Sequence, residues 1–193
     1  MKRLYIIAGC NGAGKTTASY TVLPEMLNCK EFVNADEIAK GLSPFNADAV
    51  AVEAGRLMLS RIAMLLEKGE TFSIETTLAT RSYLNLVKKA QSQGYSVTLL
   101  FFWIDSPTLA KNRVAQRVRE GGHSIPSDVI ERRYFNGLKN LFEIFMPIVD
   151  DWCLYDNNST LAQLVATGGR NKECIVEEKI TYEKITSIWK KMR

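Results

Sequence analysis

The stretch Gly9-Cys10-Asn11-Gly12-Ala13-Gly14-Lys15-Thr16-Thr17 follows directly after the apolar run Leu4-Tyr5-Ile6-Ile7-Ala8. Its glycines stand where a backbone must turn with positive φ and approach a polyphosphate closely. In the pattern G-x-x-x-x-G-K-T, successive N–H groups and the N-terminus of the following helix point at the anion. The stretch therefore predicts a phosphate-binding loop between a buried strand and a helix.

The residues of this loop have separate expected roles. Lys15 is expected to reach the β- and γ-phosphates of a nucleoside triphosphate, and the Thr16 hydroxyl is expected to be a Mg²⁺ ligand. The expected nucleotide contacts are Gly9, Asn11, Gly12, Ala13, Gly14, Lys15, Thr16 and Thr17. Helical spacing from Thr16 to Leu27 predicts the helix that follows, with Pro24 as its discordant residue.

The composition indicates one α/β domain. The chain has 193 residues, of which 46% are hydrophobic and 24% are charged, as in ordinary soluble globular proteins. The apolar run near Met1 is used by the first strand, so we expect no signal peptide. No apolar run approaches the roughly 20 residues that a membrane span needs. We therefore expect a cytoplasmic protein without a membrane partner.

The cysteines give no metal or disulfide pattern. Cys10, Cys29, Cys153 and Cys174 are scattered, and the chain has a single histidine. Neither a zinc site nor a disulfide framework is therefore indicated. Cys10 lies within the phosphate-binding loop, where a thiol could have a lowered pKa, although most such thiols are inert.

The net charge of +4 is concentrated in one segment. Residues 107–141 hold seven basic and three acidic side chains, a surplus equal to that of the whole chain. A basic surface can indicate nucleic-acid binding. However, no aromatic residue lies between these basic residues before Tyr134, so base stacking is not the natural interpretation. Polyphosphate fits better, and a nucleic-acid partner is not expected.

Strands and helices alternate along the chain. After the first strand we expect strands at 31–34, 71–74, 96–103 and 152–155. Helices are expected at 48–67, 81–93, 128–145 and 182–190, and a further one opens at Asp105-Ser106-Pro107. Segments 161–166 and 173–176 are expected to pair as an edge hairpin across Gly168-Gly169. This order predicts a three-layer α/β/α sandwich on a mainly parallel sheet, the fold of P-loop nucleoside triphosphate hydrolases. The ligand is then expected at the carboxyl ends of the strands.

Three side chains follow the predicted strands and supply candidate chemistry. Asp36 follows the second strand and is our candidate base for an acceptor hydroxyl, although it could instead cap the next helix. Glu75 could organise Mg²⁺, hold acceptor hydroxyls, or form a structural ion pair. Thr77 would add a hydroxyl contact to the acceptor or cap a helix. Asp36, Glu75 and Thr77 are the predicted substrate contacts.

The basic segment predicts an arginine-bearing lid, which we define as residues 107–146. The whole chain, 1–193, is expected to form a single domain that includes this lid. Arg113 and Arg117 share a helix face, whereas Arg119 does not. Gly121-Gly122 next to them would allow the helix to bring guanidinium groups onto the transferred phosphoryl group. Arg113 and Arg117 are therefore predicted nucleotide contacts, with Arg117 catalytic beside Asp36 and Lys15. A solvated basic helix is the alternative.

The sequence assigns less specific roles to the other polar residues of the lid. Arg132 and Arg133 are either lid residues or surface charge. His123 fits a polar loop residue better than a catalytic acid. The segment 160–193 is expected to form the edge hairpin and a closing helix.

Taken together, the motifs resemble the zeta-toxin family of P-loop kinases. The resemblance rests on Gly9 to Thr17, Asn34-Ala35-Asp36-Glu37-Ile38, Ile74-Glu75-Thr76-Thr77-Leu78, the arginine-bearing helix and Tyr155-Asp156. The better-known members are bacterial toxins that phosphorylate UDP-N-acetylglucosamine with ATP and Mg²⁺. The resemblance implies ATP-Mg²⁺ on Lys15 and Thr16, Asp36 as base, Glu75 and Thr77 at the acceptor, and Arg117 near the phosphates.

The sequence departs from the toxins at two positions. An acidic residue of the toxins corresponds to Leu59, and their second lid arginine corresponds to His123. We therefore expect an ATP-dependent kinase of a small-molecule hydroxyl, with a nucleotide sugar as first acceptor and an antitoxin protein as a possible partner. A nucleotide-dependent switch acting through a partner is the alternative.

Overall fold

The computed structural model describes residues 1–122 and 124–192. Within them, one seven-stranded sheet has the order β2-β3-β1-β4-β5-β6-β7. The strands are β1 (Arg3–Ala8), β2 (Glu31–Val33), β3 (Phe72–Thr76), β4 (Ser96–Trp103), β5 (Asp151–Asp156), β6 (Gln163–Gly169) and β7 (Lys172–Val176). Strands β2, β3, β1, β4 and β5 pair in parallel, and β6 and β7 extend the sheet antiparallel. The predicted mainly parallel sheet is confirmed.

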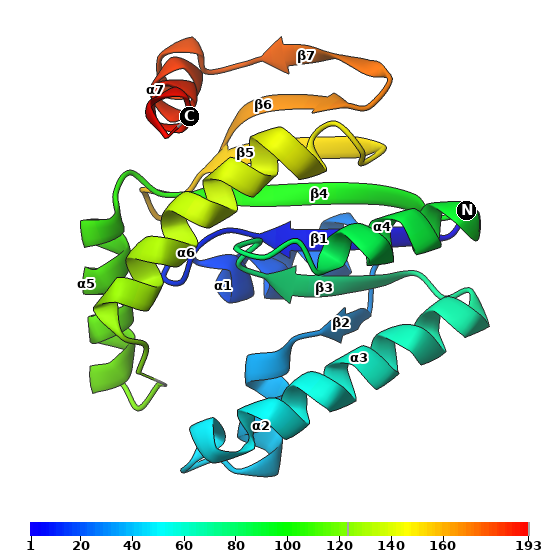
Figure 1. The fold of residues 1–193 in the computed structure, drawn as a ribbon, viewed down its shortest axis with the longest axis vertical. Helices are drawn as coiled ribbons and strands as arrows, with labels where there is room; N and C mark the ends of the chain where they lie inside the picture. The colour runs from blue at the N-terminus through cyan, green and yellow to red at the C-terminus, as the bar shows by residue number, and fades with distance from the viewer. Residues whose placement is uncertain (123, 193) are drawn as a thin grey trace.

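Helices cover both faces of this sheet (Figure 1). The α-helices are α1 (Lys15–Thr21), α2 (Ala35–Leu42), α3 (Ala51–Lys68), α4 (Tyr83–Ser92), α5 (Pro107–Arg119), α6 (Ser127–Asn140) and α7 (Lys179–Lys191). Three short turns of other helical types are η1 (Val22–Met26), η2 (Ala47–Val50) and η3 (Leu141–Phe145). Helices α3, α4 and α6 lie in front of the sheet in Figure 1, and α1 lies behind it. No helix in the described part of the chain combines the length and apolar character that a membrane crossing requires.

The central strand β1 is apolar from Leu4 to Ala8 because both of its faces are buried there. Leu4 and Ile6 belong to the core shared with α3, α4 and α6, whereas Tyr5 and Ile7 belong to the core on the α1 side. Neighbouring residues therefore point to opposite layers, as the two-residue period of a strand requires. This double burial fixes the strand that leads into the phosphate-binding loop.

The first helix is shorter than the predicted span of 16–27. Regular α-helix ends at Thr21, and the π-helical turn η1 holds Pro24. Proline has no N–H to donate to the carbonyl four residues earlier, and its ring crowds that carbonyl. The widened turn accommodates Pro24 without ending the helical path.

The C-terminal hairpin forms as predicted, but its turn lies at residues 170–171 instead of Gly168-Gly169. Both glycines lie inside β6. A Cβ on Gly168 would lie 2.4 Å from the Trp152 ring, and one on Gly169 would lie 2.1 Å from the Asp150 carbonyl oxygen. These glycines therefore permit close packing of β6 on β5, and the predicted turn position was wrong.

Candidate active site

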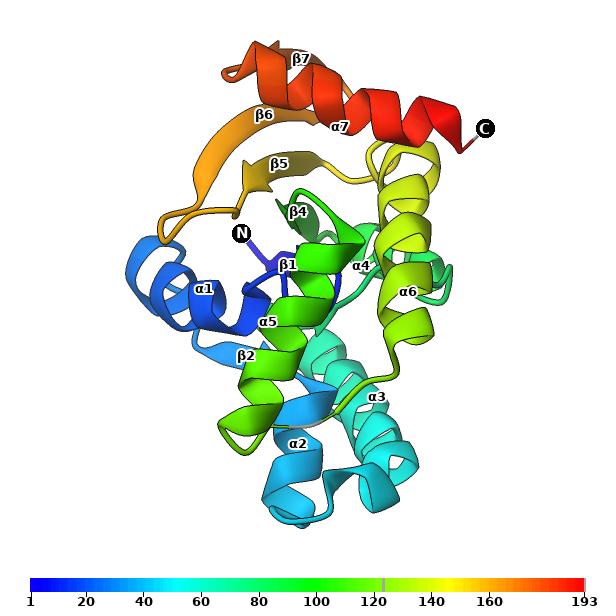
Figure 2. The same ribbon diagram turned by 90° about the vertical axis from the view of Figure 1, so that its left-hand side faces the viewer.

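A cavity of about 700 Å³ lies at the carboxyl ends of the parallel strands. Figure 2 looks onto this end of the sheet, with α5 crossing in front of it. The phosphate-binding loop, α2, the start of α3 and α5 all contribute to its wall. The lining residues are Asn11, Gly12, Gly14, Lys15, Thr16, Thr17, Ala35, Asp36, Glu37, Ala39, Lys40, Ala47, Asp48, Ala51, Glu75, Arg113, Arg117, Glu120, Gly121 and Gly122.

The loop has the backbone that its glycines predict. Gly12 and Gly14 both have φ of +78°, a conformation that other residues rarely adopt. A Cβ on Gly12 would lie 2.7 Å from the Ala110 carbonyl oxygen, and one on Gly14 would lie 2.5 Å from the Asn157 amide nitrogen. The loop is thus enclosed by α5 on one side and by the turn after β5 on the other.

Lys15, Thr16 and Glu75 form one polar group at the start of α1. The buried Lys15 ammonium donates to the Cys10 carbonyl oxygen at 2.9 Å, and its Nζ lies 3.6 Å from Glu75 Oε1. The Thr16 hydroxyl donates to Glu75 Oε2 at 2.8 Å. Glu75 on β3 therefore faces the phosphate-binding loop directly.

Asp36 lies in the first turn of α2 and its exposed side chain lines the cavity. The N-cap of α2 is Asn34, whose side-chain oxygen accepts from the Asp36 N–H at 2.8 Å. The alternative that Asp36 itself caps the helix was therefore wrong. Our sequence reasoning missed Asn34, although an asparagine just before a helix is a recognised N-cap signal.

Arg113 ties the loop to the turn after β5. Its Nη1 donates to the carbonyl oxygens of Asn157 at 2.9 Å and Gly12 at 3.4 Å, and its Nη2 donates to that of Asn158 at 2.8 Å. The Asn157 amide donates in turn to the Ala13 carbonyl oxygen at 2.7 Å. The turn at 156–159 is thus anchored to the phosphate-binding loop by Arg113 and by the Asn157 side chain.

The other arginines of the lid segment separate into two groups. Arg117 is half-buried, lines the cavity and packs against Gly122, where a Cβ would lie 2.7 Å from its side chain. Arg119 and Arg132 are exposed. Arg133, left open by the sequence, donates through Nη1 to Asn11 Oδ1 at 3.1 Å and so contacts the loop. His123 lies outside the described residues.

The cavity lining leaves out three predicted site residues, which are Gly9 and Ala13 of the loop and Thr77. Thr77 is the one of these that lies outside the loop. It follows β3 and its carbonyl oxygen would lie 2.6 Å from a Cβ on Gly137, so this backbone packs against α6. Helix α4 begins later, at Tyr83, with Ser82 at its N-cap position, so Thr77 is not a helix cap. Leu59, where the toxins have an acid, is exposed on α3 and is also absent from the lining.

Cys10 is a buried residue of the loop, and this burial raises the pKa of its thiol to about 11. The positive charge of Lys15 acts in the opposite direction but is the smaller effect. A thiolate is therefore strongly disfavoured at neutral pH, and the alternative of a lowered pKa was wrong.

Comparisons with known proteins agree with this arrangement. The family model described as Zeta toxin matches residues 1–161. An uncharacterised protein of Haemophilus influenzae is 28% identical over 127 residues, which are 65% of this chain and 88% of that protein.

Two solved structures are similar in fold. A chain of the AvrRxo1-ORF1:-ORF2 complex with ATP gives a TM-score of 0.76 at 19% identity, over 97% of this chain but only 64% of that chain. A structure from the PezAT chromosomal toxin–antitoxin system of Streptococcus pneumoniae gives 0.68 at 17% identity, over 98% of this chain and 85% of that one. At these identities the likeness concerns the fold alone. The family match, in contrast, covers most of the sequence and all of β1 to β5, and the chain therefore belongs to the zeta toxin family.

Proposed function

We propose that this chain is an ATP- and Mg²⁺-dependent kinase that transfers the γ-phosphoryl group of ATP to a hydroxyl of a small molecule. The observation that carries the proposal is the single cavity that joins the phosphate-binding loop, Glu75, Asp36 and Arg117. Phosphoryl transfer depends mainly on positioning and electrostatic stabilisation, and this cavity contains a group for each task. A structure of the similar AvrRxo1 complex with ATP supports the choice of nucleotide.

The oxygen donors beside the loop fit Mg²⁺. The Thr16 hydroxyl and the Glu75 carboxylate lie 2.8 Å apart, and hard oxygen ligands are those that Mg²⁺ prefers. Thr16 would hold the ion, with Glu75 beside it, and bound Mg²⁺ would neutralise developing charge on the phosphates. This assignment gives Glu75 a role on the metal side, in addition to the acceptor contact that the resemblance implies.

Asp36 is suited to act as the base. Its carboxylate is exposed at the cavity and makes no hydrogen bond or ion pair within the described residues, so both oxygens can receive a proton. The acceptor hydroxyl would give its proton to Asp36 as its oxygen bonds to the γ-phosphorus. The bond from that phosphorus to the β,γ-bridging oxygen breaks, and ADP leaves.

Lys15 and Arg117 would supply positive charge to the transferred group. Lys15 is buried at the start of α1, and in its present position its ammonium already lies against Glu75. Arg117 on α5 lines the same cavity as residues of α2. A guanidinium group that approaches the transferred phosphoryl group stabilises the charge of the transition state. The lid segment 107–146 would bring it there and exclude water.

The acceptor is the least constrained part of the proposal. By family resemblance, UDP-N-acetylglucosamine or a related nucleotide sugar is the first acceptor to test. Besides Asp36, the cavity wall includes Glu37, Lys40 and Asp48, whose polar groups could hydrogen-bond a polyhydroxylated molecule, and Lys40 Nζ donates to Glu37 Oε1 at 2.7 Å.

A second candidate is the same chemistry in a toxin controlled by a protein partner. The similar structures come from a two-protein complex and a toxin–antitoxin system, which favours this possibility. It predicts that expression of the chain alone inhibits growth and that Asp36→Asn removes the inhibition.

The test is ³¹P NMR of the purified protein with Mg-ATP, with and without UDP-N-acetylglucosamine. A new phosphomonoester signal, absent in Lys15→Ala and Asp36→Asn, is the expected result. Phosphate release that Asp36→Asn does not change would contradict the kinase and favour a nucleotide-dependent switch. Turnover that depends on Asp36 without a sugar product would retain the kinase and direct the search for the acceptor to a metabolite extract.

A further inference from the structure

The side chain of Asn34 connects two strands at the carboxyl edge of the sheet. It is 6% exposed and lies between β2 and α2. Its Oδ1 accepts from the Asp36 N–H at 2.8 Å, and its Nδ2 donates to Glu75 Oε2 at 2.9 Å. Both halves of one amide are therefore used, one on the helix that carries Asp36 and one on the carboxylate beside the phosphate-binding loop.

The acceptor of the second bond is shared. Glu75 Oε2 also accepts from the Thr16 hydroxyl at 2.8 Å, so Asn34 and Thr16 both donate to the same carboxylate oxygen. The order β2-β3-β1 places the three residues on adjacent strands or on the segments that follow them. A continuous chain of hydrogen bonds thus runs from the backbone of Asp36 through Asn34 and Glu75 to Thr16.

We propose that Asn34 is a positioning residue that holds Glu75 and the Asp36-bearing turn of α2 in a fixed relation to the Mg²⁺–nucleotide site. The inference rests on the proposed function and adds a residue to it. The side-chain hydrogen bonds of Asn34 within the described residues go to Glu75 and to the Asp36 N–H, so it acts through Glu75 and the α2 backbone. Because it is buried, a lost donor cannot readily be replaced by water.

The two hydrogen bonds can be separated by substitution. Asn34→Ser retains a side-chain oxygen that can cap α2 but loses the amide donor to Glu75. Asn34→Asp also retains the cap and places a second carboxylate against Glu75. Asn34→Ala loses both bonds. If Asn34 acted only as a helix cap, the serine and aspartate variants would behave like the wild type.

The experiment measures binding of a non-hydrolysable ATP analogue by calorimetry over a series of Mg²⁺ concentrations, together with the melting temperature. We expect the half-saturating Mg²⁺ concentration to rise about tenfold in the serine and alanine variants, as loss of a hydrogen bond to a charged group predicts. We expect the melting temperature to fall further in Asn34→Ala than in Asn34→Ser. In steady-state kinetics at saturating Mg²⁺, kcat should fall about tenfold in Asn34→Ser and Asn34→Ala. The KM for ATP should change less than twofold in these two variants.

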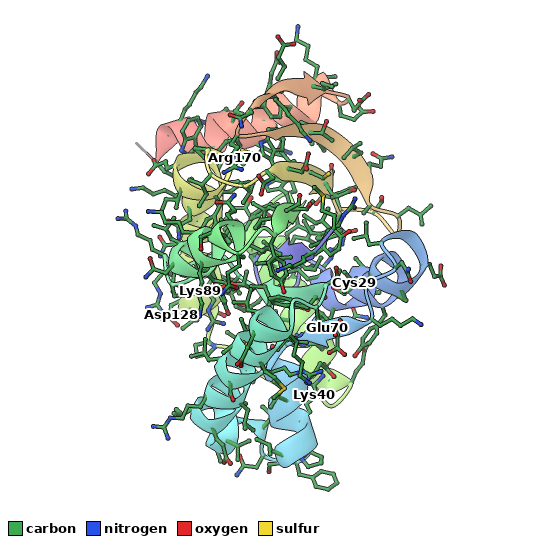
Figure 3. The ribbon with its side chains drawn as sticks, turned by 90° about the vertical axis from the view of Figure 1, so that its right-hand side faces the viewer. Cys29, Lys40, Glu70, Lys89, Asp128 and Arg170 are labelled. Atoms are coloured by element: carbon green, nitrogen blue, oxygen red, sulfur yellow. The ribbon has the colours of Figure 1, made fainter. Side chains whose placement is uncertain are left out.

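A matched control lies at the amino edge of the sheet. The Gln91 amide donates to Asp150 Oδ2 at 3.1 Å, which is another amide–carboxylate bond between elements. Figure 3 looks onto this edge, where the labelled Arg170 marks the neighbourhood of Asp150, its ion-pair partner at 2.7 Å. Gln91→Glu should lower the melting temperature and leave the Mg²⁺ dependence of nucleotide binding unchanged.

Different results would contradict the positioning role of Asn34 and the proposed kinase activity. A wild-type Mg²⁺ dependence and kcat in Asn34→Ser and Asn34→Asp would overturn the positioning role, whatever the activity. A wild-type protein that binds the analogue with Mg²⁺ but phosphorylates no acceptor would contradict the kinase, while the Mg²⁺ series would still decide on Asn34. Nucleotide binding that is independent of Mg²⁺ in the wild type would overturn the inference.

Discussion

The Thr16 hydroxyl donates to the Glu75 carboxylate at 2.8 Å, which joins the first turn of α1 to the end of β3. Glu75 Oε1 lies 3.6 Å from the Lys15 ammonium, so the same carboxylate faces both polar side chains of the phosphate-binding loop. The Lys15 and Glu75 side chains are 7% and 10% exposed. A carboxylate this shielded from water interacts more strongly with a nearby cation than a surface carboxylate does.

Glu75→Gln should therefore weaken Mg²⁺ binding at the proposed metal position without unfolding the protein. The amide keeps the shape of the side chain and an oxygen for the Thr16 hydroxyl, but it removes the negative charge beside the proposed metal position. We expect the half-saturating Mg²⁺ concentration for nucleotide binding to rise at least tenfold. Calorimetry of the ATP analogue measures this, and circular dichroism confirms the fold. An unchanged Mg²⁺ requirement would assign Glu75 to the acceptor instead.

Arg117 and Arg119 offer a matched pair on α5. Arg117 lines the cavity, whereas Arg119 is exposed and is absent from the lining. Since an arginine on the transferred phosphoryl group typically contributes a factor of about 10³ or more to kcat, Arg117→Ala should lower turnover by at least about a hundredfold. Arg119→Ala should remain within twofold of the wild type. Steady-state kinetics of both variants test this, and equal losses would indicate a general effect of positive charge on α5.

Arg113→Lys should reduce stability although it conserves charge. The guanidinium group donates to three carbonyl oxygens on two segments, and a lysine ammonium cannot reproduce that planar geometry. We expect a loss of about 1–3 kcal/mol in the free energy of unfolding, together with weaker nucleotide binding. Urea denaturation and calorimetry give the two quantities. A stable variant with lost nucleotide affinity would instead favour direct contact between Arg113 and the phosphates.

The sequence was sufficient where the signal is local. Strand Ser96–Trp103 has the predicted bounds because a strand buried on both faces is apolar at nearly every position. Ser106 and Pro107 start α5 as predicted, since the serine side chain accepts from the Leu109 N–H at 3.2 Å. The phosphate-binding loop likewise depends on residues that are adjacent in the chain.

The sequence was insufficient where distant segments meet. The hydrogen bonds of Arg113 to Gly12 and Asn157 depend on the packing of α5 against two loops. The helical spacing could predict which face of the helix Arg113 lies on, but not these partners. The use of Asn34 by both α2 and Glu75 depends on the order of the strands, which no local pattern specifies. The packing of the Thr77 backbone against α6 likewise depends on a segment that is distant in the sequence.

The burial of Cys10 predicts a loss of stability in alkaline solution. Its pKa rises from 9.0 to about 11 in the folded protein because burial disfavours the thiolate. The folded state therefore holds the thiol proton more tightly than the unfolded state does. The contribution of this thiol to the free energy of unfolding is complete below pH 9 and disappears as the pH rises to about 11. The two-unit difference corresponds to roughly 3 kcal/mol.

Cys10→Ala removes this contribution and isolates it from other alkaline titrations. The variant should be less stable than the wild type at pH 8, because it loses buried contacts. The difference between the two free energies of unfolding, which we call the gap, should narrow by about 2 kcal/mol between pH 8 and pH 10.5. Urea denaturation at both pH values measures the gap. Thiol alkylation at pH 8 gives an independent check, in which the exposed Cys174 reacts and Cys10 does not. Rapid alkylation of Cys10 in the folded protein, or a gap that does not narrow, would show that this thiol is accessible to water.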